Sequence, residues 1–378
     1  MTLGVQYIKA AFLSHDQDHA LSYALNCPRG SLHHYVQMSN FSIHHQRQNR
    51  KYYHELLSSL KQNIDLYSPL YSRTAIAYYR QLAEDDGLRT ECKSFILATE
   101  NNPFFAFVGF KSTNASGFSA VGTPEIPSTF IELPTLTRSM KKFIALSLDK
   151  FILDGKCECY FLDMLSGGRF SFASDHILSL NGSRHHYKLS RFVDLTRGED
   201  ELRKSLRKSY LSLINWGIRN LKIEIHTKGK VTWETFLEFR RLHIREAGRE
   251  TRSLATWEKQ YESVCSDEAF CITGSLDGQL VSAGYFIIDG YHCYYGSSAS
   301  RRDLFHKPLF HSLMWKALLE AKARGARSFE TGEMYPYNIT NRPEYISTKQ
   351  IQIAKFKAGF GGDLRPSLII GYESNEKL

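Results

Sequence analysis

A chain of 378 residues exceeds what one ordinary hydrophobic core requires, and its length suits two domains. An apolar fraction of 42% excludes a wholly disordered chain, and because no run of eighteen apolar residues occurs, we expect no membrane-spanning helix. The formal charge of +9 permits acidic partners such as nucleic acid, nucleotide-linked substrates or anionic membrane surfaces, without requiring any of them.

The cysteines, the histidines and the N-terminus set further limits. The N-terminal residues lack the basic start and apolar stretch of a secretory signal, so we expect a cytosolic protein. None of the seven cysteines forms a CxxC pair, and Cys157 and Cys159 alternate within an apolar run, as buried thiols do. The histidine pairs at 33–34 and 44–45 have no carboxylate or cysteine at ligand spacing. We therefore predict no metal site and a solvated or lid-like leader.

In chain order, the first half alternates helices and strands. Apolar residues at helical spacing predict a helix over Tyr71–Leu82, which ends at Asp85-Asp86-Gly87. A hairpin of two strands and a later helix–strand pair follow, which indicates an α/β module. Their predicted ranges are Ser94–Thr99, Phe104–Phe110, 137–153 and Glu158–Leu162. Turn and charged residues are frequent over 174–200, where we place the seam between two modules.

The second half gives a clearer pattern, with Asp277-Gly278 as the turn of a second hairpin. The order is helix, strand, helix, hairpin, strand, helix and strand, followed by one more strand-like run. This order is the layout of the GNAT acetyltransferase fold. The predicted helices are Glu201–Trp216, Thr232–Ala247 and Leu309–Ala323, and the predicted strands are Leu221–His226, Phe270–Ser275, Leu280–Ile288, His292–Gly296, Ser328–Thr331 and Ile351–Phe356.

Four segments in the same order carry a resemblance to a known family. They are the basic helix at 202–217, the Tyr-Tyr-Gly-Ser-Ser-Ala run at 294–299 with the helix after Pro308, the segment 325–332, and the Phe-Lys-Ala-Gly-Phe-Gly-Gly run at 356–362. Together they resemble the FemABX family of aminoacyltransferases. The resemblance implies an α/β fold of two tandem GNAT-like domains, here 1–190 and 191–378, with a cleft between them.

The resemblance also implies a donor and a set of substrate contacts. The donor would be aminoacyl-tRNA, with no bound cofactor, and the family's basic and aromatic helix residues are matched by Arg207, Lys208 and Tyr210. The family's lysine after phenylalanine is matched by Lys357, with Lys355 close by. The expected partners are therefore aminoacyl-tRNA and an amine-bearing precursor, with no DNA and at most peripheral membrane contact.

Two departures from the family leave the acceptor open. Leu211 stands where the family helix usually has a second arginine, and the long coiled-coil arm of some members is absent. A peptidoglycan precursor, a nucleotide-linked sugar, a lipid-linked saccharide and a small natural-product amine all remain candidate acceptors.

Acyl transfer to an amine needs a proton acceptor and donors for the oxyanion, and no GxSxG elbow suggests a covalent route. Glu330 and Glu333 lie at the end of a predicted strand, the position that faces the cleft in open α/β sheets. We predict Glu333 and Lys357 as the catalytic residues, with a salt-bridged loop glutamate as the alternative. If 351–356 is a strand, Lys355 and Lys357 point the same way.

Other candidate substrate contacts lie near the helix at 309–323. Tyr295 and Ser297 are expected at the floor of the cleft, with Tyr335 shaping the acceptor pocket. Arg301, Arg302 and Lys307 are expected to contact phosphates of a substrate or of tRNA, although a solvated basic loop is an equally good interpretation, and His306 is a further candidate substrate contact.

Rival functions remain open at the sequence level. The run 300–307 contains no glycine, whereas an acetyl-CoA enzyme keeps a glycine-rich pyrophosphate loop there. This argues against, without excluding, an acyl-CoA-dependent N-acetyltransferase that acts on an amino sugar. A non-catalytic RNA- or nucleotide-binding module on a degenerate GNAT scaffold is the third hypothesis.

Overall fold

The computed structural model describes residues 41–100, 102–155, 157–335 and 346–373. The histidine pair at 33–34 and most of the predicted leader lie outside the described residues, whereas His44 and His45 end strand β1 (Phe41–His45). Within the described part of the chain, no helix combines the length and apolar character that crossing a membrane requires.

The N-terminal half, β1 to α7, is a sheet with helices on both faces. Phe143 and Leu148 of α6 pack on one face, and Leu56 and Leu60 of α4 pack on the other. The remaining elements are α4 (Arg50–Lys61), η2 (Pro69–Tyr71), α5 (Arg73–Asp85), β2 (Arg89–Cys92), β3 (Phe95–Thr99), β4 (Asn102–Val108), β5 (Phe110–Thr113), β6 (Ser119–Val121), β7 (Ser128–Glu132), α6 (Arg138–Gly155), β8 (Glu158–Met164) and α7 (Phe172–Leu178).

The C-terminal half, α8 to α13, repeats this arrangement. Ile214 of α9 and Leu313 of α12 pack on one face of its sheet, and Phe239 of α10 and Trp257 of α11 pack on the other. Its elements are α8 (Glu199–Ser205), α9 (Lys208–Asn220), β10 (Lys222–His226), α10 (Trp233–Ala247), α11 (Leu254–Cys265), β11 (Ala269–Leu276), β12 (Gln279–Asp289), β13 (His292–Ser300), η3 (Arg302–Leu304), α12 (His311–Ala323), β14 (Ser328–Glu333) and α13 (Thr348–Ala358).

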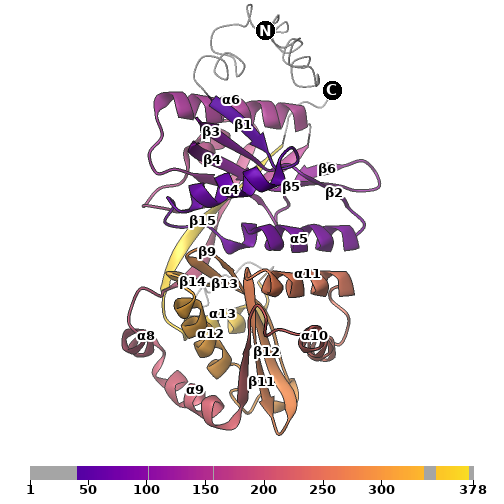
Figure 1. Ribbon diagram of the computed structural model, residues 1–378, viewed down its shortest axis with the longest axis vertical. Helices are drawn as coiled ribbons and strands as arrows, with labels where there is room; N and C mark the ends of the chain where they lie inside the picture. Colours follow the sequence, from indigo (N-terminus) through magenta and orange to yellow (C-terminus); the bar gives the residue numbers. More distant parts are fainter. Residues whose placement is uncertain (1–40, 101, 156, 336–345, 374–378) are drawn as a thin grey trace, which may run out of the picture.

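Two long strands join the halves into one sheet. Strand β9 (Ser183–Asp194) pairs with β14 of the C-terminal half, and β15 (Asp363–Tyr372) pairs with β8 of the N-terminal half. The two strands also pair with each other, so the N-terminal half is joined by β15 from the C-terminal part of the chain, and the C-terminal half is joined by β9, which directly follows the N-terminal half. Figure 1 shows both strands crossing the middle of the molecule, with α5 and α11 side by side at the boundary. The domain limits 1–190 and 191–378 stay a prediction.

In each half, two parallel strands pair briefly and then diverge. Strands β13 and β14 pair only from His292 to Tyr294, opposite Ser328 to Glu330, although β13 continues to Ser300. Strands β7 and β8 pair over two residues and separate in the same way. The divergence opens space at the carboxyl ends of these strands, which is where open α/β sheets bind ligands.

The predicted strand Ile351–Phe356 is wrong, because this segment belongs to helix α13. Its alternating apolar residues suggested a strand, but Ser347 and Gln350 form a capping box that starts a helix. A helix turns by about 100° per residue, so side chains two residues apart point in nearly opposite directions. Lys355 and Lys357 therefore do not share a face.

Two other segments also differ from their prediction. The single helix Glu201–Trp216 is two helices, because the chain leaves helical geometry at Leu206 and the Arg207 amide donates to the Gly359 carbonyl. Gly217 does not end the helix; α9 continues to Asn220. The turn-rich segment 174–200 contains α7 and the central strand β9.

Candidate active site

Strand β14 ends with two glutamates that reach the same space. The register of β14 against β9 shifts between Glu330 and Gly332, which adds one residue to β14. Residues three apart on a regular strand face opposite ways, but this extra residue allows Glu330 and Glu333 to line one cavity. Gly332 has φ +95°, a backbone conformation that favours glycine.

Lys357, in the last turn of α13, places its ammonium against this strand end. A Cβ atom at position 332 would lie 2.7 Å from Lys357 Nζ, so glycine leaves the room that the ammonium occupies. The same Nζ lies 5.5 Å from the centroid of the Tyr295 ring. Burial lowers the pKa of Lys357 to about 8, although the carboxylates of Glu330 and Glu333 act in the opposite direction.

The two glutamates differ in environment. Glu330 is 8% exposed, and burial raises its pKa to about 7, against the effects of a hydrogen bond from Ser190 and the charges of Lys188 and Lys357. Glu333, by contrast, is partly exposed, and its Oε2 forms an ion pair with Lys188 Nζ at 3.0 Å. Glu330 is therefore the better placed to exchange a proton near neutral pH.

A small cavity of about 70 Å³, the inter-half cavity, joins this strand end to the N-terminal half. Its walls include Tyr71 and Tyr79 from the N-terminal half and Tyr294, Glu330 and Glu333 from the C-terminal half. The Tyr71 hydroxyl donates to the Pro127 carbonyl at 2.6 Å, which fixes that ring. Tyrosine rings and carboxylates together suit the head of a small cation such as an amine.

A larger pocket of about 910 Å³, the C-terminal pocket, lies among β13, α10, α13 and the chain that leads into α12. Tyr295, Lys307 and Phe356 line it. Tyr294 lines the inter-half cavity whereas its neighbour Tyr295 lines the C-terminal pocket, as adjacent strand residues facing opposite ways would. Lys357 is in the lining of neither space; its Nζ lies near Gly332 on β14 and near the Tyr295 ring of the C-terminal pocket.

Two of the three residues predicted on the basic helix support α13. Tyr210 is 5% exposed, and its hydroxyl donates to the Phe356 carbonyl at 3.0 Å. Arg207 lies over the Tyr210 ring, and its Nη2 donates to the Lys355 carbonyl at 3.1 Å. Lys208 is exposed at the start of α9. Tyr210 therefore helps to hold the helix that carries Lys357, and its burial leaves it no direct access to a substrate.

The other predicted contacts are dispersed. Arg301 Nη1 donates to Gln279 at 3.0 Å and the guanidinium pairs with Asp303, outside the lining of the C-terminal pocket. The buried Ser297 Oγ has no hydrogen-bond partner among the described residues. His306 contacts Lys307, the Tyr335 hydroxyl accepts from Gln350 at 3.4 Å, and Lys355 is exposed.

No protein-family model matches this sequence, and no curated protein matches it. Solved structures do match over most of its length. The crystal structure of FemX aligns with TM-score 0.59 at 13% identity, over 82% of this chain and 94% of that one. The chain has a FemABX-like fold. A conserved protein of unknown function from Bacteroides thetaiotaomicron aligns with TM-score 0.52 at 11% identity, covering 89% of this chain and all of that one.

A third match, L-PGS from Bacillus licheniformis, has TM-score 0.50 and 11% identity, over 85% of this chain and 91% of that one. These identities are low, so the similarity concerns the fold. It confirms the predicted α/β class and the FemABX-like resemblance, because the match covers both halves.

Within this FemABX-like fold, sequence reasoning missed the residues that the N-terminal half and β9 supply. Tyr71, Tyr79, Lys188 and Ser190 lie far from β14 in the chain, and no motif marks them. Their contribution follows from the strand exchange, because β9 brings Lys188 and Ser190 beside β14.

A second pair of acidic residues, also missed, lies where β7 and β8 diverge. Glu132 accepts from the Phe172 amide at 2.6 Å, and Asp163 accepts from the amide and the hydroxyl of Ser171. Burial raises the pKa of both carboxyls, that of Glu132 to about 7. Neither this pair nor any other group of described side chains assembles three metal-ligating residues.

Proposed function

We propose that this chain is an acyltransferase that forms an amide on a primary amine, with aminoacyl-tRNA as the donor. The observation that carries the proposal is the position of Lys357, whose ammonium lies at the end of β14, near the buried carboxyl of Glu330 and the Tyr295 ring of the C-terminal pocket. The FemABX-like fold is consistent with it.

In this proposal the acceptor amine occupies the inter-half cavity and the activated ester enters from the C-terminal pocket. The amine nitrogen attacks the ester carbonyl and passes its proton to Glu330, whose pKa of about 7 suits a base near neutral pH. Lys357 donates hydrogen bonds to the oxyanion and then gives a proton to the ribose oxygen as the C–O bond breaks. The products are an amide and a free ribose hydroxyl, so atoms and charge balance.

The cavity also limits the acceptor. A space of about 70 Å³ holds only the end of a molecule, so the amine must project from the larger precursor on a narrow chain or ring substituent. The precursor is an amine-bearing compound of the cell envelope or one linked to a nucleotide. The surrounding carboxylates bind it as an ammonium, which loses one proton to solvent before attack, and Glu330 takes the second proton as the C–N bond forms.

The experiment is a transfer assay with tRNA charged with a mixture of radiolabelled amino acids. The acceptors offered are a lysine-containing peptide, a nucleotide-linked amino sugar and a natural-product amine, at two salt concentrations. We expect label in an alkali-stable amide, and a rate that falls with salt because RNA binding is electrostatic. Turnover with acetyl-CoA alone would contradict the donor assignment. Turnover with neither donor, together with salt-sensitive RNA binding, would contradict the enzyme assignment.

A further inference from the structure

Strand β9 places two polar side chains on the face that lines the inter-half cavity. Lys188 and Ser190 are two residues apart on this strand, so they point the same way, and both line the cavity. Lys188 Nζ forms an ion pair with Glu333 Oε2 at 3.0 Å, and the Ser190 hydroxyl donates to the Glu330 carboxylate. Each carboxylate at the end of β14 is thus engaged by a side chain of β9.

The ammonium of Lys357 has no such partner. No carboxylate in the described part of the chain forms an ion pair with it, although the charges of Glu330 and Glu333 both act on it. Its Nζ lies beside Gly332 and 5.5 Å from the centroid of the Tyr295 ring. Because Lys188 engages Glu333, the N–H groups of Lys357 stay available to a substrate oxygen.

The charge of Lys188 acts on both groups that the proposed reaction uses. Burial raises the pKa of Glu330, and the positive charge of Lys188 lowers it. Burial lowers the pKa of Lys357, and Lys188 lowers it further. The carboxylate of Glu333 raises the pKa of both groups, so the two members of the ion pair have opposing effects that partly cancel.

Other titratable and charged groups surround Lys188 from several elements. They are Tyr71 of η2, Tyr79 of α5, Glu125 before β7 and Tyr294 of β13, with His186 of β9 and Arg365 of β15 on the same face of the sheet. Burial raises the pKa of the three tyrosines well above the usual range. The tyrosines therefore stay uncharged where Glu330 and Lys357 titrate.

We propose that Lys188 is a positioning residue, whose ammonium occupies Glu333 and thereby leaves the ammonium of Lys357 free to face Glu330 and the reacting oxygen. The inference rests on the proposed function only in treating Glu330 and Lys357 as the reacting groups. Without Lys188, Glu333 is left to pair with Lys357, and the pKa values of Glu330 and Lys357 both rise. The pH range in which Glu330 is ionised while Lys357 is protonated then moves to higher pH as a whole.

The test follows both groups directly by NMR, with ¹⁵N-labelled lysine and ¹³C-labelled glutamate in the full chain. The Nζ signal of Lys357 and the carboxyl signal of Glu330 are assigned with Lys357→Arg and Glu330→Gln. In wild type the titration midpoints of Lys357 and Glu330 should lie at about 8 and about 7. In Lys188→Met both midpoints should rise by about 0.5–1 pH unit, the effect of a nearby charge that solvent partly screens.

Three further variants separate the charge of Lys188 from its packing. Lys188→Arg keeps the charge and should keep both midpoints within about 0.2 pH unit of wild type. The double variant Lys188→Met with Glu333→Gln removes both charges of the ion pair and should show less than about half of the rise. Lys93→Met is the control, because Lys93 is a comparably exposed lysine that pairs with Glu91 at 2.9 Å outside the lining of the cavity. It should leave both midpoints unchanged.

Unchanged midpoints in Lys188→Met, or an equal rise in Lys188→Arg, would overturn the inference, whatever the transferase assay shows. The expected rise, together with a kcat/KM profile that moves by the same amount, would support both the inference and the proposed function. The expected rise with no acyl transfer by wild type, or with a profile that does not move, would support the charge arrangement and contradict the proposed function. The two failures are therefore distinguishable.

Discussion

At the scale of single residues, the site depends on a lysine that burial makes easier to deprotonate. Lys357→Met removes the ammonium from the Gly332 side of β14 and should lower kcat/KM at least about 100-fold, the usual cost of losing one oxyanion donor. The melting temperature should not fall, because the change also removes the cost of burying a charge.

Lys355→Ala is the control for this variant, since Lys355 lies two residues away and is exposed. It should keep wild-type activity apart from small effects on RNA affinity. If Lys357→Met transfers at the wild-type rate in the charged-tRNA assay, the ammonium has no part in the chemistry.

The pH dependence of the reaction follows from the two perturbed groups. Burial raises the pKa of Glu330 to about 7, so the carboxyl gains a base form only as the pH rises through 7. Burial lowers the pKa of Lys357 to about 8, so the ammonium is lost as the pH rises through 8. The profile of kcat/KM should therefore be bell-shaped with its maximum between about 7 and 8.

Glu330→Gln should remove the acidic limb of this profile along with most of the activity. Glu333→Gln should keep both limbs, because Glu333 is the more exposed carboxylate and pairs with Lys188. An acidic limb that survives in Glu330→Gln and disappears in Glu333→Gln would restore Glu333 as the base.

At the scale of secondary-structure elements, glycines and caps decide where the helices lie. Gly217 in α9 faces α12, and a Cβ atom there would lie 2.1 Å from Ser312 Oγ. Gly217→Ala should therefore push the two helices apart and cost about 1–3 kcal/mol of unfolding free energy, measured by urea denaturation.

The reciprocal exchange tests whether this contact is the cause. In the double variant Gly217→Ala with Ser312→Gly, the crowded side chain is gone, so at least half of the lost stability should return. Ser312 is fully buried and its hydroxyl has no hydrogen-bond partner among the described residues, so its removal leaves few contacts to lose. No recovery would mean that another consequence of the alanine, such as strain within α9, is responsible.

The elements also show how far sequence reasoning reaches. Periodicity and turn residues predicted the hairpin β11–β12, helix α10 and helix α12 close to their observed limits, because these features are local. The helical geometry of α13 was missed because alternation within 351–356 outweighed the capping box just before it. Helix α11 was not predicted, although Ser253 caps it.

The candidate site was only partly accessible to prediction for a related reason. Glu330 and Glu333 were located by their place at the end of a predicted strand, and Lys357 by the resemblance carried in motifs. The environment that distinguishes Glu330 from Glu333 comes from Lys188 and Ser190 on β9, a strand concealed in a polar segment. The pairing of strands that are far apart in the chain leaves no periodic signal in the sequence. The different environments of Glu330 and Glu333 could therefore be recognised only in the structure.

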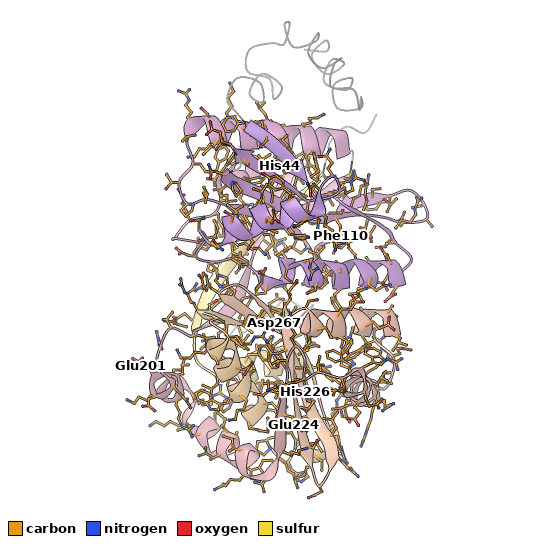
Figure 2. The ribbon with its side chains drawn as sticks, in the orientation of Figure 1. His44, Phe110, Glu201, Glu224, His226 and Asp267 are labelled. Atoms are coloured by element: carbon orange, nitrogen blue, oxygen red, sulfur yellow. The ribbon has the colours of Figure 1, made fainter. Side chains whose placement is uncertain are left out.

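At the scale of the whole molecule, two antiparallel helices, α5 of the N-terminal half and α11 of the C-terminal half, lie side by side along the boundary between the halves. Glu268 of the C-terminal half accepts from the Thr74 amide at 2.9 Å and pairs with Arg73, at the start of α5. At the other end, Asp85 of α5 accepts from the hydroxyls of Ser253 and Thr256 at the start of α11. Figure 2 shows Asp267, the neighbour of Glu268, at this boundary. Each half therefore supplies the cap of a helix that belongs to the other.

This arrangement makes the inter-half cavity dependent on contacts outside it. Tyr71 and Tyr79, which line the cavity, lie in η2 and in α5. Glu268→Ala removes the carboxylate that holds the start of α5 and should cost about 1.5–3 kcal/mol, the range for hydrogen bonds to a charged group. The KM for the acceptor should rise while the KM for the charged tRNA stays unchanged, because the C-terminal pocket, from which the donor is proposed to enter, uses no residue of α5.

Hydrogen exchange provides the direct measurement. In Glu268→Ala, the amides of α5 should exchange faster than in wild type. The amides of α6, at the far side of the N-terminal half, should exchange at the wild-type rate. Glu262→Ala is the control, because among the described residues the Glu262 carboxylate pairs with Lys259 of its own helix and with no other cation. If Glu268→Ala changes exchange evenly across both halves, the carboxylate contributes to global stability and not to the boundary. If exchange in α5 rises but the KM for the acceptor does not, the amine binds away from the tyrosines of the N-terminal half.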